Sequence, residues 1–319
     1  MANRPLRICS SLSIIPFSTP FSTLFYTPLL RFTFPIAPPK PDIGAVQEVK
    51  ETEQKEQVPA KLPPMEEAHI DALEEILGHK FSDRYLVEEA MTHGSAYYPL
   101  KGEMSYERLE FMGDAVLTFG VASEVFFTYP NLAPGPMTRL RAANVDKEKL
   151  ARIAVAHGLH RYLRHKAPQL ESQINQFVDD LDNYPIHSNG LLDPPKVLAD
   201  IVESLLGAVY VDTNKCYETV WKIFMRLSRP FITIETLGKH PVTELHELCQ
   251  KLHNELKFND KKWAENLTVD VLLNGKVIGS ATYGPKKDIC HNRAAKVALD
   301  RLKELLSNGE LETFLKDNT

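Results

Sequence analysis

The stretch ERLEFMGDAVL, residues 107–117, decides how the rest of the chain has to be read. Its apolar residues recur at helical spacing, and its three carboxylates, Glu107, Glu110 and Asp114, stand at i, i+3 and i+7. On an α-helix those positions share one face. Because acidic side chains are rarely buried without a partner, the stretch predicts a core helix whose carboxylate face meets one or more cations.

A second acidic pair lies in the apolar run KVLADIVESLLGAVY, residues 196–210, where Asp200 and Glu203 stand at i and i+3. Two carboxylates about 4 Å apart repel by roughly 4 kcal/mol at an effective dielectric near 20, so such a cluster raises some of its own pKa values. Oxygen-only ligands suit Mg²⁺ or Mn²⁺ rather than zinc. Two acidic helices packed face to face would form a site for divalent ions that activate water for phosphodiester hydrolysis.

Ordinary roles for these residues stay open on spacing alone. The acids could be solvated, or could form ion pairs with Arg108, Arg139 or Arg141. His93, in the run THGS of residues 92–95, is interpreted as a packed, hydrogen-bonded residue rather than a general base, since a bound metal can supply hydroxide without one.

The charge of the 319-residue chain is unevenly distributed. The formal net charge is −5, which taken alone argues against a nucleic-acid partner. Residues 67–240, however, hold 18 basic and 24 acidic residues, whereas residues 241–306 hold 11 basic and nine acidic ones. A mildly basic C-terminal part therefore follows an acidic central part, and each needs its own assessment of partners.

The cysteines show neither a C-x-x-C spacing nor a disulfide framework, which indicates reduced thiols and no zinc set. They are Cys9, Cys216, Cys249 and Cys290. The chain has no run of 18 apolar residues, so we expect no membrane span.

The N-terminal segments differ in composition from the rest of the chain. Residues 1–41 are rich in Ser, Thr, Pro and Phe and contain four basic residues but no acid, a composition typical of an organelle transit peptide. This predicts a plastid address, with mitochondrion, nucleus and cytoplasm as alternatives, or else a disordered tail. Residues 42–66 are charged and poor in large apolar residues, which indicates a linker.

Two patterns follow the linker. Residues 67–237 read as helices throughout, with the polar insert of residues 172–193 expected to be a surface loop. Residues 241–306 read as helix, strands and helix in the order α-β-β-(β)-α, with Asn274–Gly275 as a two-residue hairpin turn. Residues 307–319 are left as a tail. The expected fold is an all-α domain followed by a small α+β domain.

The central part resembles the ribonuclease III family. Its run ERLEFMGDAVL is similar to the family's E-R-L-E-F-L-G-D-A-V-L, and the resemblance continues through THGS, through MTRLRAANV of residues 137–145, and through KVLADIVESLLGAVYVD of residues 196–212. It implies an all-α domain that cuts double-stranded RNA and leaves 5′-phosphate and 3′-hydroxyl ends, with Mg²⁺ or Mn²⁺ as cofactor.

The resemblance also implies roles for individual acids. Glu110, Asp200 and Glu203 would be metal ligands, Asp114 and Glu203 would be catalytic, and Glu107 would support the site.

The resemblance further implies a homodimer, with Phe111 and Met112 at its seam and one catalytic site in each protomer. One departure is Pro134, which stands where bacterial members have another glutamate and so removes a potential water-mediated metal contact.

Residues 241–306 resemble the double-stranded-RNA-binding domain. The resemblance places Lys286, Lys287 and Arg293 where phosphates flanking a groove are bound, and Glu247 where the first helix reaches the 2′-hydroxyls of the minor groove. A solvated face is the alternative for these lysines.

Two departures predict weaker RNA binding by this domain alone. Asp288 and Cys290 interrupt the basic cluster, and the usual Gly-Pro-x-His loop is replaced by a segment containing Lys261, Lys262 and Trp263.

Two functions are consistent with these observations. The first is a metal-dependent endoribonuclease, and the second is an inactive RNA-binding dimer that serves as an organellar scaffold. The complete set of acids favours the enzyme, since a decayed one should have lost at least one of them.

Overall fold

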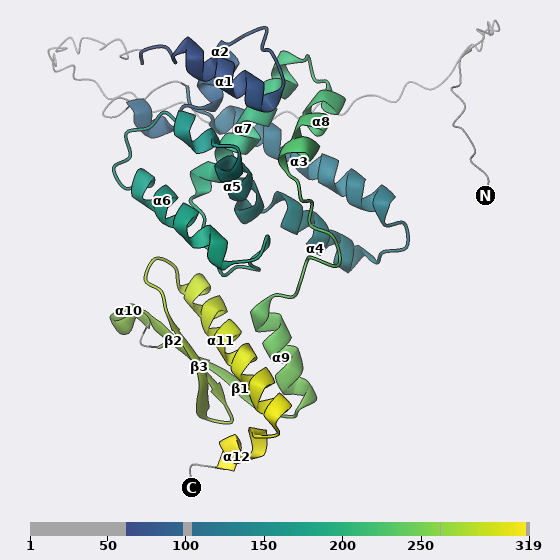
Figure 1. The fold of residues 1–319 in the computed structure, drawn as a ribbon, viewed down its shortest axis with the longest axis vertical. Coiled ribbons are helices and arrows are strands. Elements are labelled where there is room, and N and C mark those ends of the chain that lie inside the picture. The colour runs from purple at the N-terminus through teal and green to yellow at the C-terminus, as the bar shows by residue number, and fades with distance from the viewer. Residues whose placement is uncertain (1–61, 98–103, 262, 317–319) are drawn as a thin grey trace, which may run out of the picture. The chain divides into compact units, whose positions relative to one another are not determined.

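The computed structural model describes residues 62–97, 104–261 and 263–316 (Figure 1). The predictions for residues 1–41, and for all but the last few residues of the segment 42–66, lie outside the described residues. That segment is not a free linker at its end, because Met65 is buried against the core just before the first helix begins.

Residues 67–237 are built from helices alone among the described residues, apart from one isolated bridge between Thr92 and Arg164. This confirms the predicted helical character. The α-helices are α1 (Glu67–Leu77), α2 (Tyr85–Ala90), α3 (Glu107–Thr128), α4 (Pro134–Val145), α5 (Lys147–Ala156), α6 (Leu170–Asp180), α7 (Lys196–Asp212) and α8 (Tyr217–Leu227). Short 3₁₀ turns lie at Gly94–Tyr97, Leu159–Tyr162 and Leu181–Asn183.

The centre of this part is the pair α3 and α7, which make the most extensive contact between any two helices of the described residues. Two glycines allow the close approach. A Cβ added to Gly113 of α3 would lie 1.9 Å from the carbonyl oxygen of Glu203, and one added to Gly207 of α7 would lie 2.1 Å from that of Leu109. The two acidic segments are therefore brought backbone to backbone.

One element was predicted wrongly. The polar insert of residues 172–193 is not a loop throughout, because α6 runs to Asp180 and a 3₁₀ turn follows it. Ile174 and Phe177, three residues apart, are buried in the core, so the segment is an amphipathic surface helix. Its high polar content concealed that single apolar stripe.

The helix α3 is long and apolar enough to cross a membrane by length and composition, with a mean hydropathy of 1.3. One side packs on α7, and its first two turns carry Glu107, Glu110 and Asp114.

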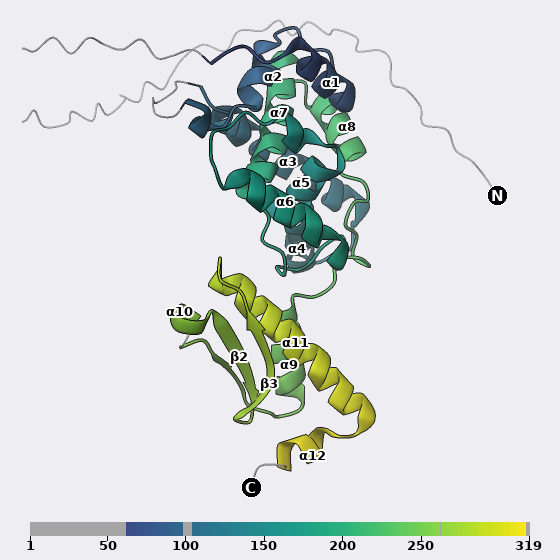
Figure 2. The same cartoon turned by 60° about the vertical axis from the view of Figure 1, so that its left-hand side comes forward.

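Residues 241–316 have a hydrophobic core of their own. The elements are α9 (Pro241–Lys251), β1 (Leu256–Asn259), α10 (Trp263–Asn266), β2 (Thr268–Leu273), β3 (Lys276–Thr282), α11 (Lys287–Asn308) and α12 (Leu311–Lys316). The three strands form an antiparallel sheet in the order β1-β2-β3, and α9 and α11 lie against one face of it (Figures 1 and 2).

The predicted hairpin is confirmed in its turn and its alternation. Asn274 and Gly275 have φ of 49° and 85°, a left-handed pair that a two-residue turn requires. Val269, Val271 and Leu273 alternate into the core from β2.

The tail assigned to residues 307–319 is shorter than predicted. The helix α11 continues to Asn308, and α12 packs its apolar residues Leu311, Phe314 and Leu315 onto the core of this part. The Lys276 Nζ donates to the Phe314 carbonyl at 2.8 Å, which ties this helix to the start of β3.

Candidate active site

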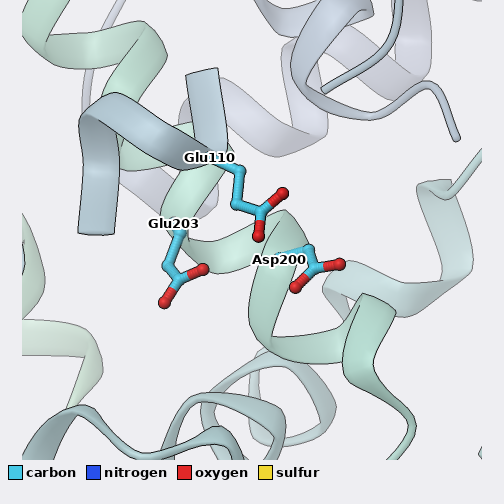
Figure 3. Close-up of side chains that lie close together, drawn as sticks. All are labelled: Glu110, Asp200 and Glu203. Atoms are coloured by element: carbon cyan, nitrogen blue, oxygen red, sulfur yellow. The ribbon is translucent and has the colours of Figure 1, made fainter. Parts of the chain in front are cut away.

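Three carboxylates converge between α3 and α7. Glu110 comes from the first turn of α3, and Asp200 and Glu203 come from successive turns of α7 (Figure 3). Each offers one oxygen, and these oxygens all lie within 4.8 Å of one another. The sequence predicted this meeting of the two acidic segments, and the close α3–α7 packing brings it about.

A lysine ammonium group holds two of these acids together. The Lys196 Nζ donates to Glu110 Oε1 at 2.7 Å and to Asp200 Oδ1 at 2.6 Å. These carboxylates hold the pKa of Lys196 above its usual value, although burial alone would lower it. The Lys196 ammonium group therefore occupies the position between these acids where a cation binds in this structure. The ion-pair partners considered from the sequence were arginines, not this lysine.

Burial and the negative charges of its neighbours shift the pKa of Glu203. Burial, followed by the charges of Asp114, Asp200 and Glu110, raises the pKa of Glu203 to about 8. In the protein alone this side chain keeps its proton near neutral pH, and a cation that joined the cluster would release it. The donor set of three carboxylates thus fits a hard divalent ion.

Two buried acids elsewhere in the domain behave differently. Asp212 accepts hydrogen bonds from His79 and from the backbone amides of Ser82 and Asp83, and Glu74 accepts bonds from Lys80, Arg84 and the Phe81 amide. Burial raises the pKa of each, but these donors outweigh it and hold both below the usual value. They fasten α1, α2 and α7 together, so burial alone does not define the site.

The remaining predicted acids line the same cavity of about 590 Å³ without joining the three-carboxylate cluster. Asp114 accepts a hydrogen bond from Thr118 Oγ1 at 3.3 Å, and Glu107 lies one turn before Glu110. Lys147 also lines this cavity, a position that the sequence did not single out.

The sequence also missed Tyr106, the residue before α3. Its hydroxyl donates to Asp200 Oδ2 at 2.9 Å, and the side chain is buried. No local pattern connects Tyr106 to a residue 94 positions later. Only the α3–α7 packing reveals that connection.

Pro134 is the first residue of α4, a position that suits proline because the amide there has no helical partner. His93 is held by a hydrogen bond between its Nδ1 and Ser95 Oγ at 2.7 Å. Burial, followed by the charge of His165, lowers the pKa of His93.

The predicted RNA-binding side chains lie around α9 and the start of α11. Lys287 pairs with Asp260 at 2.7 Å, and Arg293 lies 4.3 Å from the centroid of the Tyr283 ring. Lys286 is the residue before α11, and Glu247 on α9 pairs with Lys239 at 3.0 Å.

Two of the expected departures take a specific form. Cys290 is fully buried and lies 3.1 Å from the Ala281 carbonyl oxygen, so it is a core residue and not a missing phosphate contact. The short helix α10 stands in the β1–β2 connection, where Trp263 Nε1 donates to the Tyr283 carbonyl at 3.2 Å.

An apolar stripe is exposed along α3. Phe111 is 76% exposed and Phe119 is 62% exposed, and Phe126 and Phe127 continue the stripe towards the end of the helix. Met112 is also exposed, at 36%. Large apolar side chains in a contiguous row are typical of a surface that another protein covers.

The comparisons with known proteins show the family of the chain. Residues 107–214 match the family described as the Ribonuclease III domain. The rice protein Ribonuclease 3-like protein 3 (Oryza sativa subsp. japonica) is 58% identical over 263 residues, which cover 82% of this chain and 88% of that protein. The chain therefore belongs to the ribonuclease III family of endoribonucleases.

Longer relatives match over a similar stretch. Endoribonuclease Dicer homolog 1 of Oryza sativa subsp. japonica is 42% identical over 262 residues, which cover 77% of this chain but 14% of that protein. Among solved structures, the nuclease domain of ribonuclease III from Campylobacter jejuni is 30% identical and covers 51% of this chain and 98% of its own, with a TM-score of 0.39.

Proposed function

We propose that this protein is a divalent-metal-dependent endoribonuclease that cleaves both strands of double-stranded RNA and leaves 5′-phosphate and 3′-hydroxyl ends. The observation that carries the proposal is the convergence of Glu110, Asp200 and Glu203, with oxygens within 4.8 Å of one another, in a chain of the ribonuclease III family. The names of the relatives, ribonucleases and endoribonucleases, support the same reaction class.

Glu110, Asp200 and Glu203 would hold Mg²⁺ or Mn²⁺, which when bound would orient and activate water and stabilise the leaving alkoxide. Because its pKa is raised to about 8, Glu203 holds a proton near neutral pH, and it would release that proton on becoming a ligand. Asp114 and Glu107 add negative charge at the edge of the cavity and take the catalytic and supporting roles that the family resemblance assigns them.

The lysine that bridges the acids has two tasks in this proposal. Lys196 neutralises Glu110 and Asp200 in the protein alone, which lowers the repulsion that would otherwise open the α3–α7 contact. Its side chain is 67% exposed, so its ammonium group can turn from the acids to an RNA phosphate without leaving a buried position.

We assign residues 241–306 to RNA binding, as a double-stranded-RNA-binding domain in the order α-β-β-β-α. The basic start of α11, with Lys286 and Lys287 and with Arg293 further along, would meet phosphates, and Glu247 on α9 would meet 2′-hydroxyls. Because Lys287 already pairs with Asp260, RNA has to displace that carboxylate, which supports the prediction of weak binding by this domain alone.

We assign the exposed stripe of α3 to a homodimer, with Phe111 and Met112 at its seam and one site in each protomer. The stripe begins beside Glu110, so two copies joined through it would bring two sites to one duplex. The proposed address is the plastid, on the composition of residues 1–41, and a reporter fused to residues 1–45 tests it against mitochondrion, nucleus and cytoplasm.

The competing function is an inactive RNA-binding scaffold. The test incubates a long RNA duplex with the full chain in Mg²⁺ and in EDTA. The proposal expects shortening in Mg²⁺ only, whereas an intact but retarded duplex supports the scaffold. The variant Glu203→Gln should abolish cutting and leave duplex binding within about threefold, which is the change expected when a ligand and not an RNA contact is removed. Glu124→Gln, a part-exposed carboxylate further along α3, is the matched control.

A further inference from the structure

We propose that Tyr106 is a positioning residue for the metal site, and that the THGS segment of residues 92–95 holds it in place. The tyrosine hydroxyl orients the Asp200 carboxylate so that its other oxygen faces the cation. This inference rests on the proposed metal-dependent function and assigns a role to two features that the function leaves unused.

The two oxygens of Asp200 have different partners. Oδ2 accepts the hydrogen bond from the Tyr106 hydroxyl at 2.9 Å. Oδ1 lies 2.6 Å from the Lys196 Nζ, and the same Nζ lies 2.7 Å from Glu110 Oε1. Oδ1 thus faces the Lys196 ammonium group, and Oδ2 faces the Tyr106 hydroxyl. By binding Oδ2, Tyr106 leaves Oδ1 as the oxygen that faces the cation position.

A carboxylate needs such a partner in order to be held still. The terminal torsion of aspartate is broad and roughly two-fold, so packing does not set its rotation. Asp200 is 4% exposed, and its surroundings leave water little access to Oδ2. A hydrogen bond from a buried hydroxyl therefore both satisfies this oxygen and fixes the rotation.

The tyrosine itself is fixed from two sides. Its carbonyl oxygen accepts from the Glu110 amide at 2.8 Å, which links it to a second proposed ligand, and its amide donates to the Thr92 carbonyl at 3.0 Å. Its ring lies 5.8 Å from the His93 ring, centroid to centroid. Tyr106 therefore joins the 92–95 segment to the starts of both ligand-bearing regions.

The 92–95 segment is braced in turn. The Thr92 hydroxyl donates to the Glu88 carbonyl at 2.6 Å, the His93 amide donates to the Arg164 carbonyl at 3.0 Å, and Ser95 Oγ lies 2.7 Å from His93 Nδ1. These bonds hold the polar segment in place next to the site. Its residues act through Tyr106 and not on the substrate.

The test compares Tyr106→Phe with the unmodified full chain by calorimetric titration of Mg²⁺ and of Mn²⁺ in the absence of RNA. Loss of the hydroxyl should weaken metal binding by about 10- to 100-fold, the effect typical of partners that orient metal ligands. Cleavage should need a correspondingly higher metal concentration, while its rate at saturating metal and its KM for the duplex stay within about threefold. Tyr162→Phe, a partly buried tyrosine packed on the same core, is the control and should match the unmodified chain.

Three outcomes decide the matter. Metal affinity of Tyr106→Phe within twofold of the unmodified chain would overturn the inference and leave the proposed function standing. The double variant gives a second outcome. If Tyr106→Phe lowers metal affinity as much in the Asp200→Asn background as in the unmodified chain, the hydroxyl does not act through Asp200 and the inference is overturned. An unmodified chain that bound neither ion would overturn the proposed function, and this inference with it.

A folding defect does not remove the test. If Tyr106→Phe alone fails to fold, the inference requires Asp200→Asn to restore folding to it, because the double variant no longer buries a carboxylate oxygen, Oδ2, that has lost its hydrogen-bond donor. A double variant that stays unfolded would show that the hydroxyl serves the fold by another route, and would contradict the inference.

Discussion

Replacing Gly113 by alanine tests whether the α3–α7 contact builds the site. The added Cβ would lie 1.9 Å from the Glu203 carbonyl oxygen, and ordinary contact begins near 3.4 Å, so the helices have to separate by about 1.5 Å. Overpacking of this kind costs up to about 3 kcal/mol, and alanine recovers about 1 kcal/mol through its higher helix propensity. The expected net loss is about 2 kcal/mol of unfolding free energy.

The larger effect should be on metal binding. Glu110 and Glu203 lie on the two helices that separate, and Mg²⁺ demands near-ideal octahedral geometry with short bonds to its ligands. We expect Gly113→Ala to weaken Mg²⁺ binding at least about tenfold, measured by titration calorimetry, with stability measured by urea unfolding in EDTA. Gly135→Ala is the control, because a Cβ there meets nothing within 4 Å. A Gly113→Ala protein that matched this control in both measurements would refute the reasoning.

Four further predictions concern charge, metal binding and assembly. Because its pKa is raised, Glu203 contributes stability to the metal-free fold that is fully present below the ordinary pKa near 4.5 and is lost as the pH rises through about 8. The unfolding free energy in EDTA should therefore fall across that window, and it should fall less in Glu203→Gln. Mg²⁺ binding should tighten over the same window, with proton release visible in buffers of different ionisation enthalpy. Lys196→Met should destabilise the metal-free protein by about 1–2 kcal/mol, because Asp200 loses its cation. The same variant should bind Mg²⁺ more tightly. Weaker Mg²⁺ binding would contradict the role of Lys196 as an internal cation. Phe119→Glu should shift a dimer to monomer in sedimentation with little change in melting temperature, and an unchanged sedimentation coefficient would remove the stripe from the interface.

Much of the site could be predicted from the sequence because both acidic helices carry their ligands at helical spacing within apolar runs. The period of 3.6 predicts which side chains share a face, and it put Glu107, Glu110 and Asp114 on one helix face and Asp200 and Glu203 on another. The separate expectation that these two faces meet is confirmed for Glu110, Asp200 and Glu203.

The period does not predict what lies opposite either face. Lys196 stands four residues before Asp200 on the same helix, so that pair is local in the sequence. The bond from Lys196 to Glu110, the bond from Tyr106 to Asp200 and the role of Gly113 depend on how two distant helices cross.

The same limit explains the errors outside the site. The helix α6 was taken for a loop because one apolar stripe in a polar stretch, with Ile174 and Phe177, is a weak local signal until a core is present to bury it. The helix α12 was missed because six residues carry too little periodicity to be distinguished from a tail. In both cases tertiary packing, and not intrinsic propensity, decides the structure.

The proposed function requires α3 and α7 to hold a divalent ion jointly. The direct measurement is anomalous X-ray scattering from crystals of the protein grown with Mn²⁺. The account predicts a peak between Glu110, Asp200 and Glu203, with the Lys196 ammonium displaced from it. Ordered crystals in Mn²⁺ that showed no peak there, with Lys196 still bridging Glu110 and Asp200, would contradict it.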